Sequence, residues 1–396
     1  PMSLKTRSGR SWGRLGMKFN IWNDFPQKPL PELLDFIVDN RGKTVPTVSQ
    51  EEACEIVLIA TNCIRNENLY PVYEKVRYIS KETYEKWFRA HPISGDIIFV
   101  NKGTPGRICF CPENIDFCIA QDMMAFRVNS SVLYNKYLLA VLRSREMQEQ
   151  IRITSVGDTI PHFKKEFLKE LTIPLPPMDV QQIIGDYYFK LSEKIELNKK
   201  INENLEQQAQ AIYRSMFVTL HHDSDRMGLL SELITVKYGK DHKKLNDGVY
   251  PVYGSGGIMR YVERPLYDKE SVLIPRKGSL NNVMYVNEPF WSVDTMFYTE
   301  MKQPNVAKFV FHFVKSKDLA SLNAGSAVPS MTTDILNSME LRIPSADRLA
   351  EFEGLVAPLY RAIEDNTRQS ARLAALRDTL LPKLMNGEID VSAVQI

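Results

Sequence analysis

The feature that most constrains this fold is an internal repeat. A shift of 168 residues places GDTIPHFKKEFL (157–168) on GSAVPSMTTDIL (325–336), with glycines and prolines in register. The match continues without a gap as far as Leu205 over Leu373. Self-similarity on this scale indicates two copies of one structural unit rather than a single large domain.

Upstream of this stretch the correspondence is looser and needs gaps. NKGT (101–104) falls opposite RKGS (276–279), and each tetrapeptide directly follows an apolar stretch that predicts a strand. Leu33–Lys43 also resembles Leu229–Lys240. Each unit is therefore predicted to contain a variable region of short strands and turns, then a proline-marked boundary, then a long helix.

Both helices have recognisable ends. PLPP (174–177) precedes the first helix, Asp179 is expected to cap it, and no proline interrupts the run to about Val218. The second helix is expected to be capped near Ser345 and closed by Gly387.

Apolar residues recur every three or four positions along both helices, which is the spacing of a helix-pairing stripe. Pro358 lies off the stripe but is expected to kink the second helix or delay its start. The residues expected to pair the helices are Ile184, Tyr188, Leu191, Ile195, Asn198, Asn202, Leu205 and Ile212 in the first and Phe352, Val356, Leu359, Ile363, Asn366, Leu373, Leu380 and Leu384 in the second.

The two stripes are too narrow for burial in a large core, so we expect the helices to pair with each other. Antiparallel pairing about a pseudo-two-fold places Asn202 opposite Asn366 and Asn198 opposite Ser370, where buried amides would fix the register. A generic coiled-coil hairpin explains the stripes equally well, but it does not explain the duplicated globular regions.

The predicted fold class is α+β, with two mixed α/β variable domains separated by two long helices that pair as an antiparallel coiled coil in a pseudo-two-fold repeat. We expect a leader or extension at 1–16, variable domains at 17–177 and 220–344, and the first helix at 178–219. The second helix and a C-terminal tail occupy 345–396.

One glycine-rich stretch raises the question of a cofactor. PVYGSGG (251–257) could cradle the phosphate or methionyl end of such a group, but its counterpart by position, approximately 58–62, has no glycine. DNRGKT (39–44) ends like a P-loop, yet Ile37 stands where the first glycine would be. Nucleophile-elbow, H-E-x-x-H and amino-methyltransferase motifs are also missing. We therefore expect no catalytic residue, no metal ligand and no cofactor in this chain.

The cysteines and the apolar runs bear on the compartment. Five cysteines lie in the first third of the chain, at spacings that suit neither a disulfide framework nor paired zinc knuckles, and they are expected to be buried strand thiols. No apolar run reaches the roughly 18 residues of a membrane span. We expect a cytoplasmic protein without membrane contact.

Basic charge gathers locally. The whole chain is nearly balanced, with 50 Lys and Arg against 48 Asp and Glu, but 237–277 holds nine basic and five acidic residues among five tyrosines. Such a mixture suits a DNA duplex, whereas a solvated strand face is the plainer alternative. The DNA-binding candidates, mostly in turns after apolar strands, are Arg41, Lys43, Asn62, Lys102, Thr104, Arg107, Lys240, Tyr253, Ser255, Arg260, Lys277, Ser279 and Asn281.

With its regions in the order variable region, helix, variable region and helix, the chain resembles the specificity subunit of Type I restriction-modification systems. PLPPxxxQQII (174–184) and GDTIPHF (157–163) carry the resemblance, together with the duplicated helical halves, YPVYGSGG (250–257) and GDIIFVNKGTPGR (95–107). One departure is that DVQQ (179–182) replaces the more usual Glu-Gln pair, which weakens the detail of the helix cap.

The resemblance implies a DNA-reading scaffold without catalysis of its own. Each variable domain would be a target recognition domain that reads one half of a split, asymmetric sequence, and the helices would set the spacer. Two methyltransferase subunits would dock on the helices and bring S-adenosylmethionine for adenine-N6 methylation. Motor-nuclease subunits, with ATP and Mg²⁺, would join through that methyltransferase core.

Two other functions remain open at this point. One is a DNA-modifying enzyme with a methyltransferase or nuclease site hidden in a variable domain, which would act on DNA without partners. The other is a coiled-coil adaptor that binds only protein and no duplex.

Overall fold

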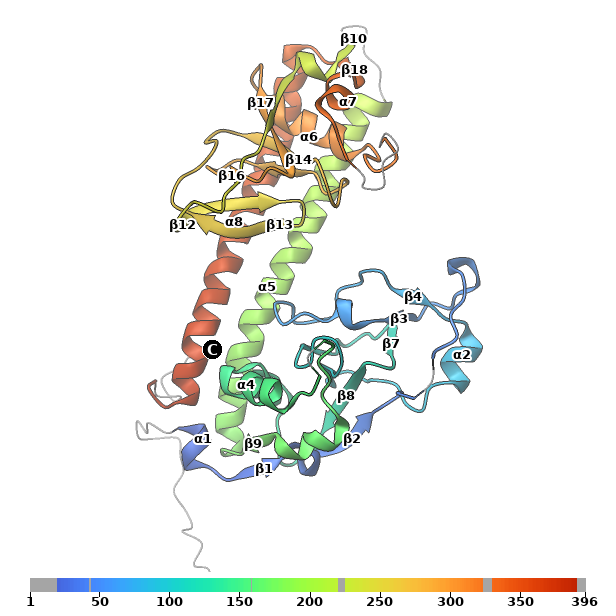
Figure 1. Ribbon diagram of the computed structural model, residues 1–396, viewed down its shortest axis with the longest axis vertical. Helices are drawn as coiled ribbons and strands as arrows, with labels where there is room; N and C mark the ends of the chain where they lie inside the picture. The colour runs from blue at the N-terminus through green and yellow to red at the C-terminus, as the bar shows by residue number, and fades with distance from the viewer. Residues whose placement is uncertain (1–19, 43, 158, 220–224, 323–329, 390–396) are drawn as a thin grey trace, which may run out of the picture. The chain divides into compact units, whose positions relative to one another are not determined.

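The computed structural model describes residues 20–42, 44–157, 159–219, 225–322 and 330–389 (Figure 1). The predicted leader at 1–16 and the DNA-binding candidate Lys43 lie outside these residues.

The chain forms two units. The first comprises the residues up to Lys200 together with those from Asn366 onward, and the second is Ile201–Asp365. The long helices α5 (Met178–Tyr213) and α8 (Ala346–Met385) each contribute to both units. Each unit therefore contains a variable region and part of both helices.

The first unit is built on two small sheets and a strand pair. One sheet has the order β2-β8-β5-β6 with antiparallel neighbours, and in the other β3 is antiparallel to β4 and parallel to β7. β1 pairs with β9. The strands are β1 (Gln27–Pro29), β2 (Leu34–Val38), β3 (Val57–Ile59), β4 (Arg77–Tyr78), β5 (Ile97–Val100), β6 (Ile108–Phe110), β7 (Phe117–Ile119), β8 (Met123–Val128) and β9 (Thr172–Pro174).

Helices close the core of this unit. Ser144 ends one helix and begins the next, where its Oγ accepts a hydrogen bond from the Met147 backbone N at 3.2 Å. Strand β5 is buried along its whole length because both of its faces are covered. The helical elements are α1 (Ile21–Asp24), η1 (Leu30–Leu33), η2 (Gln50–Glu52), η3 (Thr61–Cys63), α2 (Lys81–Lys86), α3 (Asn135–Arg143), α4 (Arg145–Thr154) and η4 (Lys165–Glu170).

The second unit repeats this plan strand for strand. Its larger sheet has the order β11-β17-β14-β15, β12 is antiparallel to β13 and parallel to β16, and β10 pairs with β18. Its elements are η5 (Arg214–Thr219), β10 (Arg226–Leu229), η6 (Leu230–Glu232), β11 (Ile234–Tyr238), β12 (Asp247–Gly254), β13 (Gly257–Val262), β14 (Ser271–Pro275), β15 (Met284–Val286), β16 (Trp291–Ser292), β17 (Met296–Met301), α6 (Ala307–Lys315), α7 (Thr333–Asn337) and β18 (Glu340–Ile343).

Matching hydrogen bonds fix the repeat register. The Leu30 backbone N donates to the Leu171 carbonyl oxygen at 2.8 Å in the first unit, and Leu230 N donates to the Met339 carbonyl oxygen at 2.9 Å in the second. Leu171 and Met339 are a pair that the 168-residue shift aligns. The duplication predicted from the sequence therefore extends to the backbone contacts of each unit.

The looser upstream alignment, which matched Leu33 with Leu229, is wrong. The carbonyl oxygen of Leu33 accepts from Asn129 N, and the equivalent bond in the second unit runs from Lys302 N to the carbonyl oxygen of Leu233, both at 2.9 Å. Leu33 therefore corresponds to Leu233 and not to Leu229. Insertions between the strands hid this register from the sequence comparison.

The predicted caps are right at the second helix and wrong at the first, although the first helix starts at the predicted residue. The Ser345 Oγ accepts from Arg348 N at 3.4 Å, and Gly387 adopts φ 70° after the last turn. α8 begins well before Pro358, which does not delay it. α5 begins at Met178, so Asp179 lies inside the first turn and is not the cap.

The two long helices contact each other within each unit, in opposite chain directions. In the first unit Tyr187 Oη donates to the Leu376 carbonyl oxygen at 3.4 Å and Asn198 Nδ2 donates to Ser370 Oγ at 3.1 Å. In the second unit Asn202 Nδ2 donates to the Ile363 carbonyl oxygen at 3.3 Å. All sixteen stripe positions predicted for helix pairing are buried or half-buried. Among the described residues, no helix is long and apolar enough to span a bilayer.

Candidate nucleic-acid interface

Two equivalent loops follow equivalent strands. After β5 the chain turns through 101–104, and after β14 it turns through 276–279. Gly103 and Gly278 adopt φ 84° and φ 85°, in the left-handed region that a side chain disfavours. The glycines of the two aligned tetrapeptides thus share one φ value to within a degree.

Each loop is held in place by a segment far along the chain, and the two segments are equivalent in the repeat. Lys102 forms a β-bridge with His162, and Lys277 forms one with Ser330, the partner that the 168-residue shift predicts. These backbone pairings fix the loops, while Lys102 and Lys277 keep their side chains exposed. Neither lysine takes part in an ion pair within the described part of the chain. An exposed, unpaired ammonium beside a fixed turn can neutralise a phosphate.

The PVYGSGG stretch forms the end of a hairpin. Gly254 pairs with Gly257 across the two-residue turn between β12 and β13. A side chain at Gly278 would place its Cβ 2.7 Å from the Ser255 Oγ, so the hairpin turn and the β14 loop touch. Asn282 Nδ2 also donates to the Ser255 carbonyl oxygen at 2.8 Å. This contact brings four predicted DNA contacts into one region: Ser255, Lys277, Ser279 and Asn281. The Asn281 amide is already engaged, because it donates to Asp318 Oδ1 at 3.0 Å and accepts from the Ala320 backbone N at 3.1 Å.

The other candidates of the second unit differ in how far their side chains are engaged. Arg260 donates to Asp247 Oδ1 at 2.9 Å and to a backbone carbonyl, so its guanidinium is already paired. Tyr253 donates to Glu288 Oε1 at 3.1 Å, and burial together with that carboxylate raises the tyrosine pKa above its ordinary value. Lys240 is exposed.

In the first unit, Arg41 is held by a carboxylate. Its Nε and Nη2 donate to Asp39 at 2.7 and 2.8 Å, and Lys165 Nζ lies 3.2 Å from the same side chain. These cations hold the Asp39 pKa well below its usual range, because they stabilise the ionised form. Arg41 is therefore neutralised locally and is a weaker candidate for phosphate contact than Lys102.

Beside Arg41 lies a basic hollow that the sequence analysis missed. It has a volume of about 220 Å³ and is lined by Asn40, Arg41, Lys86, Trp87 and Arg89. The sequence signal for this hollow is the tetrapeptide KWFR (86–89), which by itself is typical of the end of a surface helix. Only the fold brings it to the loop after β2, where the Arg89 backbone N donates to Asn40 Oδ1 at 2.9 Å.

The remaining candidates of this unit differ in exposure. Asn62 donates from Nδ2 to the Glu74 carbonyl oxygen, which occupies its amide group. Arg107 is half-buried and Thr104 is exposed in the loop between β5 and β6. Burial and the charges of Arg41 and Lys102 lower the pKa of His162, so this histidine is neutral at neutral pH.

The side chains that could hold a metal ion are scattered over the described residues. Within these residues, no three or more His, Cys, Asp or Glu side chains are grouped to hold a metal ion. All five cysteines are free, and four of them are buried. Burial raises the pKa of the Cys109 and Cys118 thiols, so they are uncharged at neutral pH.

Comparison with known proteins identifies relatives of both units. The family model for the Type I restriction modification DNA specificity domain matches residues 28–207 and 228–348. The MjaIX specificity subunit of Methanocaldococcus jannaschii is 23% identical over a gapped alignment of length 300, which covers 65% of this chain and 69% of that protein. The HindI specificity subunit of Haemophilus influenzae is 23% identical over a gapped alignment of length 410, which covers 74% of this chain and 86% of that protein.

A crystal structure shows the same fold. The S subunit of a Type-I restriction-modification system from M. genitalium superimposes with a TM-score of 0.58 at 19% identity, covering 91% of this chain and 96% of that one.

Proposed function

The chain belongs to the family of Type I restriction-modification specificity subunits, and on that premise we propose that it reads a two-part DNA sequence, one part with each unit. The observation that carries this proposal is the repetition of one exposed loop on one frame. Lys102 and Lys277 follow equivalent strands, are held by equivalent bridges and have unpaired ammonium groups among the described residues. Two reading surfaces on one chain suit a site with two halves.

Within each unit we assign positioning and reading to different residues. Lys102 and Lys277 contact phosphates, because their side chains are exposed and unengaged. Thr104, Ser255 and Ser279 face the groove edges, where hydroxyl groups can read bases. Arg107 and Lys240 support them with charge. The paired or occupied side chains, which are those of Arg41, Asn62, Tyr253, Arg260 and Asn281, make contacts only if their present partners are released.

The long helices provide the spacer in this proposal. We infer that α5 and α8 pair as an antiparallel coiled coil related by a pseudo-two-fold, and the hydrogen bonds made by Asn198 and Asn202 in their respective units support this. Two methyltransferase subunits dock on these helices. They carry S-adenosylmethionine, and motor-nuclease subunits that use ATP and Mg²⁺ join through them. The chain itself is non-catalytic and works in the cytoplasm.

Sequencing of methylated adenines tests the proposal. Cells with the cognate methyltransferase subunit would carry this chain, no specificity chain, or a chain in which 276–282 is replaced by a glycine-serine loop of equal length. We expect a two-part motif with the intact chain, no methylation without it, and loss of one half only with the replaced loop. Loss of both halves, in a variant that still assembles, would contradict separate reading by the two units.

Two controls address the alternatives. Purified chain that methylates or cuts DNA without partners would favour a hidden enzyme. A chain that binds no duplex even with its methyltransferase partner would favour a protein-only adaptor.

A further inference from the structure

One arginine of the second unit is held in place without being neutralised. Arg276 opens the loop after β14, and its guanidinium carbon lies 5.4 Å from the centre of the Tyr238 ring. Its Nη1 donates to the Asp294 carbonyl oxygen at 3.2 Å. Within the described part of the chain no carboxylate is paired with it. Because the ring and the carbonyl group are uncharged, the side chain is oriented and keeps its full positive charge.

The ring beside the arginine is itself anchored. Tyr238 ends strand β11 and packs edge-on against Phe297, with the ring centres 5.0 Å apart. Phe297 is 0% exposed, whereas Tyr238 is 52% exposed. A planar guanidinium stacks favourably on an aromatic face. The buried core therefore fixes the ring, and the ring fixes the arginine.

The backbone at this position is fixed as well. The Arg276 N donates to the Thr295 carbonyl oxygen at 2.9 Å, and the Arg276 carbonyl oxygen accepts from Met331 N at 2.9 Å. The next residue is Lys277, which bridges to Ser330. Arg276 is half-buried and Lys277 is exposed. These two neighbours in one fixed turn can therefore meet the same stretch of duplex, one at a base edge and the other at the phosphates.

The free edge of the guanidinium suits a guanine. Only Nη1 of Arg276 is used, so its Nε and Nη2 have no partner among the residues that the structure describes. The N–H groups of arginine form a rigid fork. Guanine presents O6 and N7 as neighbouring acceptors in the major groove, where a bidentate arginine is the commonest specific contact. An arginine that is already oriented loses little conformational freedom when it makes this contact.

The first unit has neither member of this pair. Asn101 stands at the position of Arg276 and is 0% exposed. A bulge in β2 shifts its pairing by one residue, so Asp39 takes the position of Tyr238. There the carboxylate neutralises Arg41 instead. The oriented arginine is therefore a property of the second unit and not of the shared frame.

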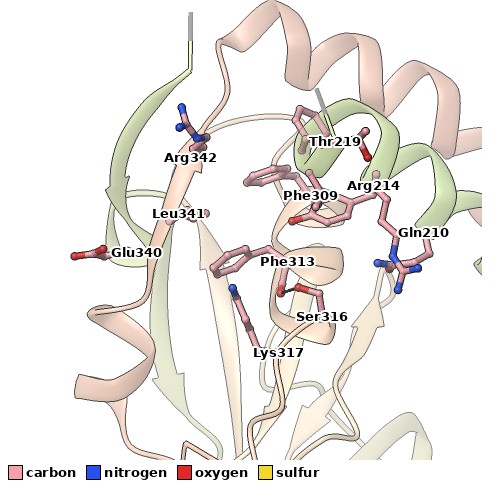
Figure 2. A pocket seen from close by; sticks show the side chains of 13 residues that line it. Gln210, Arg214, Thr219, Phe309, Phe313, Ser316, Lys317, Glu340, Leu341 and Arg342 are labelled. Atoms are coloured by element: carbon pink, nitrogen blue, oxygen red, sulfur yellow. Dashed lines mark hydrogen bonds between the residues drawn. The ribbon is translucent and has the colours of Figure 1, made fainter. Parts of the chain in front are cut away.

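The pocket of the second unit plays no part in this contact. It has a volume of about 510 Å³, and its lining comes from α5, η5, α6, β18 and the two residues that follow α6 (Figure 2). No residue of the β14 loop or of the β12–β13 hairpin is among the lining residues. We therefore expect Arg276 to meet a base edge that stays in the duplex.

We propose that Arg276, held against the Tyr238 ring, reads a guanine in the half-site of the second unit through a bidentate contact to O6 and N7. The inference rests on the proposed function, because it concerns the DNA that this unit reads. Arg276 determines specificity, and Tyr238 is a positioning residue. Lys277, the next residue, contacts phosphate and carries no sequence information.

Sequencing of methylated adenines with single variants tests the assignment, in cells that carry the cognate methyltransferase subunit. Arg276→Ala and Arg276→Lys should relax one guanine position in the half-site that is lost when 276–282 is replaced. Lysine keeps the charge but lacks the planar fork. Tyr238→Ala should relax the same position, whereas Tyr238→Phe keeps the ring and should keep the motif. Lys277→Ala is the matched control, and it should lower methylation at all sites without relaxing any position.

A modified duplex tests the contact without changing the protein. 7-Deazaguanine at the relaxed position removes the N7 acceptor and keeps the base pair. The intact chain with its methyltransferase subunit should bind this duplex about tenfold more weakly than the unmodified one. Arg276→Ala should bind both duplexes equally, and Lys277→Ala should keep the tenfold difference. Binding is followed by the anisotropy of a fluorescein-labelled duplex.

The outcomes separate this inference from the proposed function. An intact chain that produces no two-part motif would overturn the proposed function and this inference with it. A two-part motif whose guanines all stay fixed in Arg276→Ala would overturn only the arginine assignment. So would equal binding of the two duplexes by the intact chain, whatever the variants do. Weakening of every site in Arg276→Ala, as in Lys277→Ala, would make Arg276 a phosphate contact.

Discussion

The buried lysine of the second unit gives the sharpest prediction about stability. Lys308 on α6 is 5% exposed, and its Nζ donates to Glu270 Oε1 at 2.9 Å and to Glu353 Oε1 at 2.7 Å. Its ammonium also lies over the rings of Tyr285 and Tyr360, at 5.0 and 5.7 Å from their centres. Because Glu353 is on α8, this cluster ties the variable region of the second unit to one of the two long helices.

Lys308→Met removes the cation and keeps most of the volume of the side chain. Breaking a buried pair by removing one partner costs about 3–5 kcal/mol, because the other charge stays buried and unpaired. The two carboxylates here retain 31% and 23% exposure, so water offsets part of that loss. We therefore expect the free energy of unfolding of the second unit to fall by about 2–4 kcal/mol.

The matched variant is Lys308→Met with Glu270→Gln and Glu353→Gln, which removes the charges together. Its loss of stability should be smaller than that of Lys308→Met alone, because no unpaired charge remains in the interior. Urea unfolding, monitored by tyrosine and tryptophan fluorescence, measures the stability of the single and the triple variant. A single variant that loses less than about 0.5 kcal/mol, or a triple variant that is less stable than the single one, would refute the reasoning.

Three further predictions concern binding, pH and spacing. Lys102→Ala or Lys277→Ala should weaken duplex binding across all sequences and reduce the slope of log affinity against log salt by about one; an unchanged slope would exclude a phosphate contact. Burial lowers the pKa of His312 from its ordinary value of 6.5 to about 3. Between these two pH values the unfolded chain binds a proton at this side chain and the folded chain does not. Stability that is present above pH 6.5 should therefore be lost as the pH falls toward 3, and urea unfolding of His312→Gln should show less of this dependence. Inserting four residues after Leu205 lengthens a helix by about 6 Å, nearly two base-pair steps. The unread spacer in the methylated motif should grow by one or two base pairs with both half-sites unchanged, and a spacer of the original length would exclude a ruler.

Features that depend on periodicity were predictable from the sequence. The stripe spacing and the terminal Ser345 and Gly387 located α8, because helix phase and caps are local properties. The cap of α5 was assigned wrongly because two signals competed, the prolines and Asp179. The chain enters the helix directly after the prolines, and Gln181 N donates to the Pro177 carbonyl oxygen at 3.0 Å, which closes the first turn without a side-chain cap.

The candidate interface was predictable only as positions in the chain. The loop after each strand β5 and β14 was identified because a repeat aligned NKGT with RKGS. The state of each side chain was not, since it depends on distant partners. Arg41 and Arg260 look as suitable as Lys102 in the sequence, yet Asp39 and Asp247 hold their guanidinium groups. The hollow at Lys86 was missed for the same reason.

In the proposed function, one frame repeated in two units reads two different sequences. Strand order, bridge partners and the glycine conformation of the loops are the same in both, so the position of each reading surface is fixed by the repeat. Lys102 and Lys277 are repeated on that surface, but other side chains are not. Arg41 follows β2 and is neutralised by Asp39, whereas Lys240 follows β11 and is exposed. A duplicated fold with independently varied loops therefore suits an asymmetric site, because a change of loop in one unit leaves the backbone contacts of the other untouched.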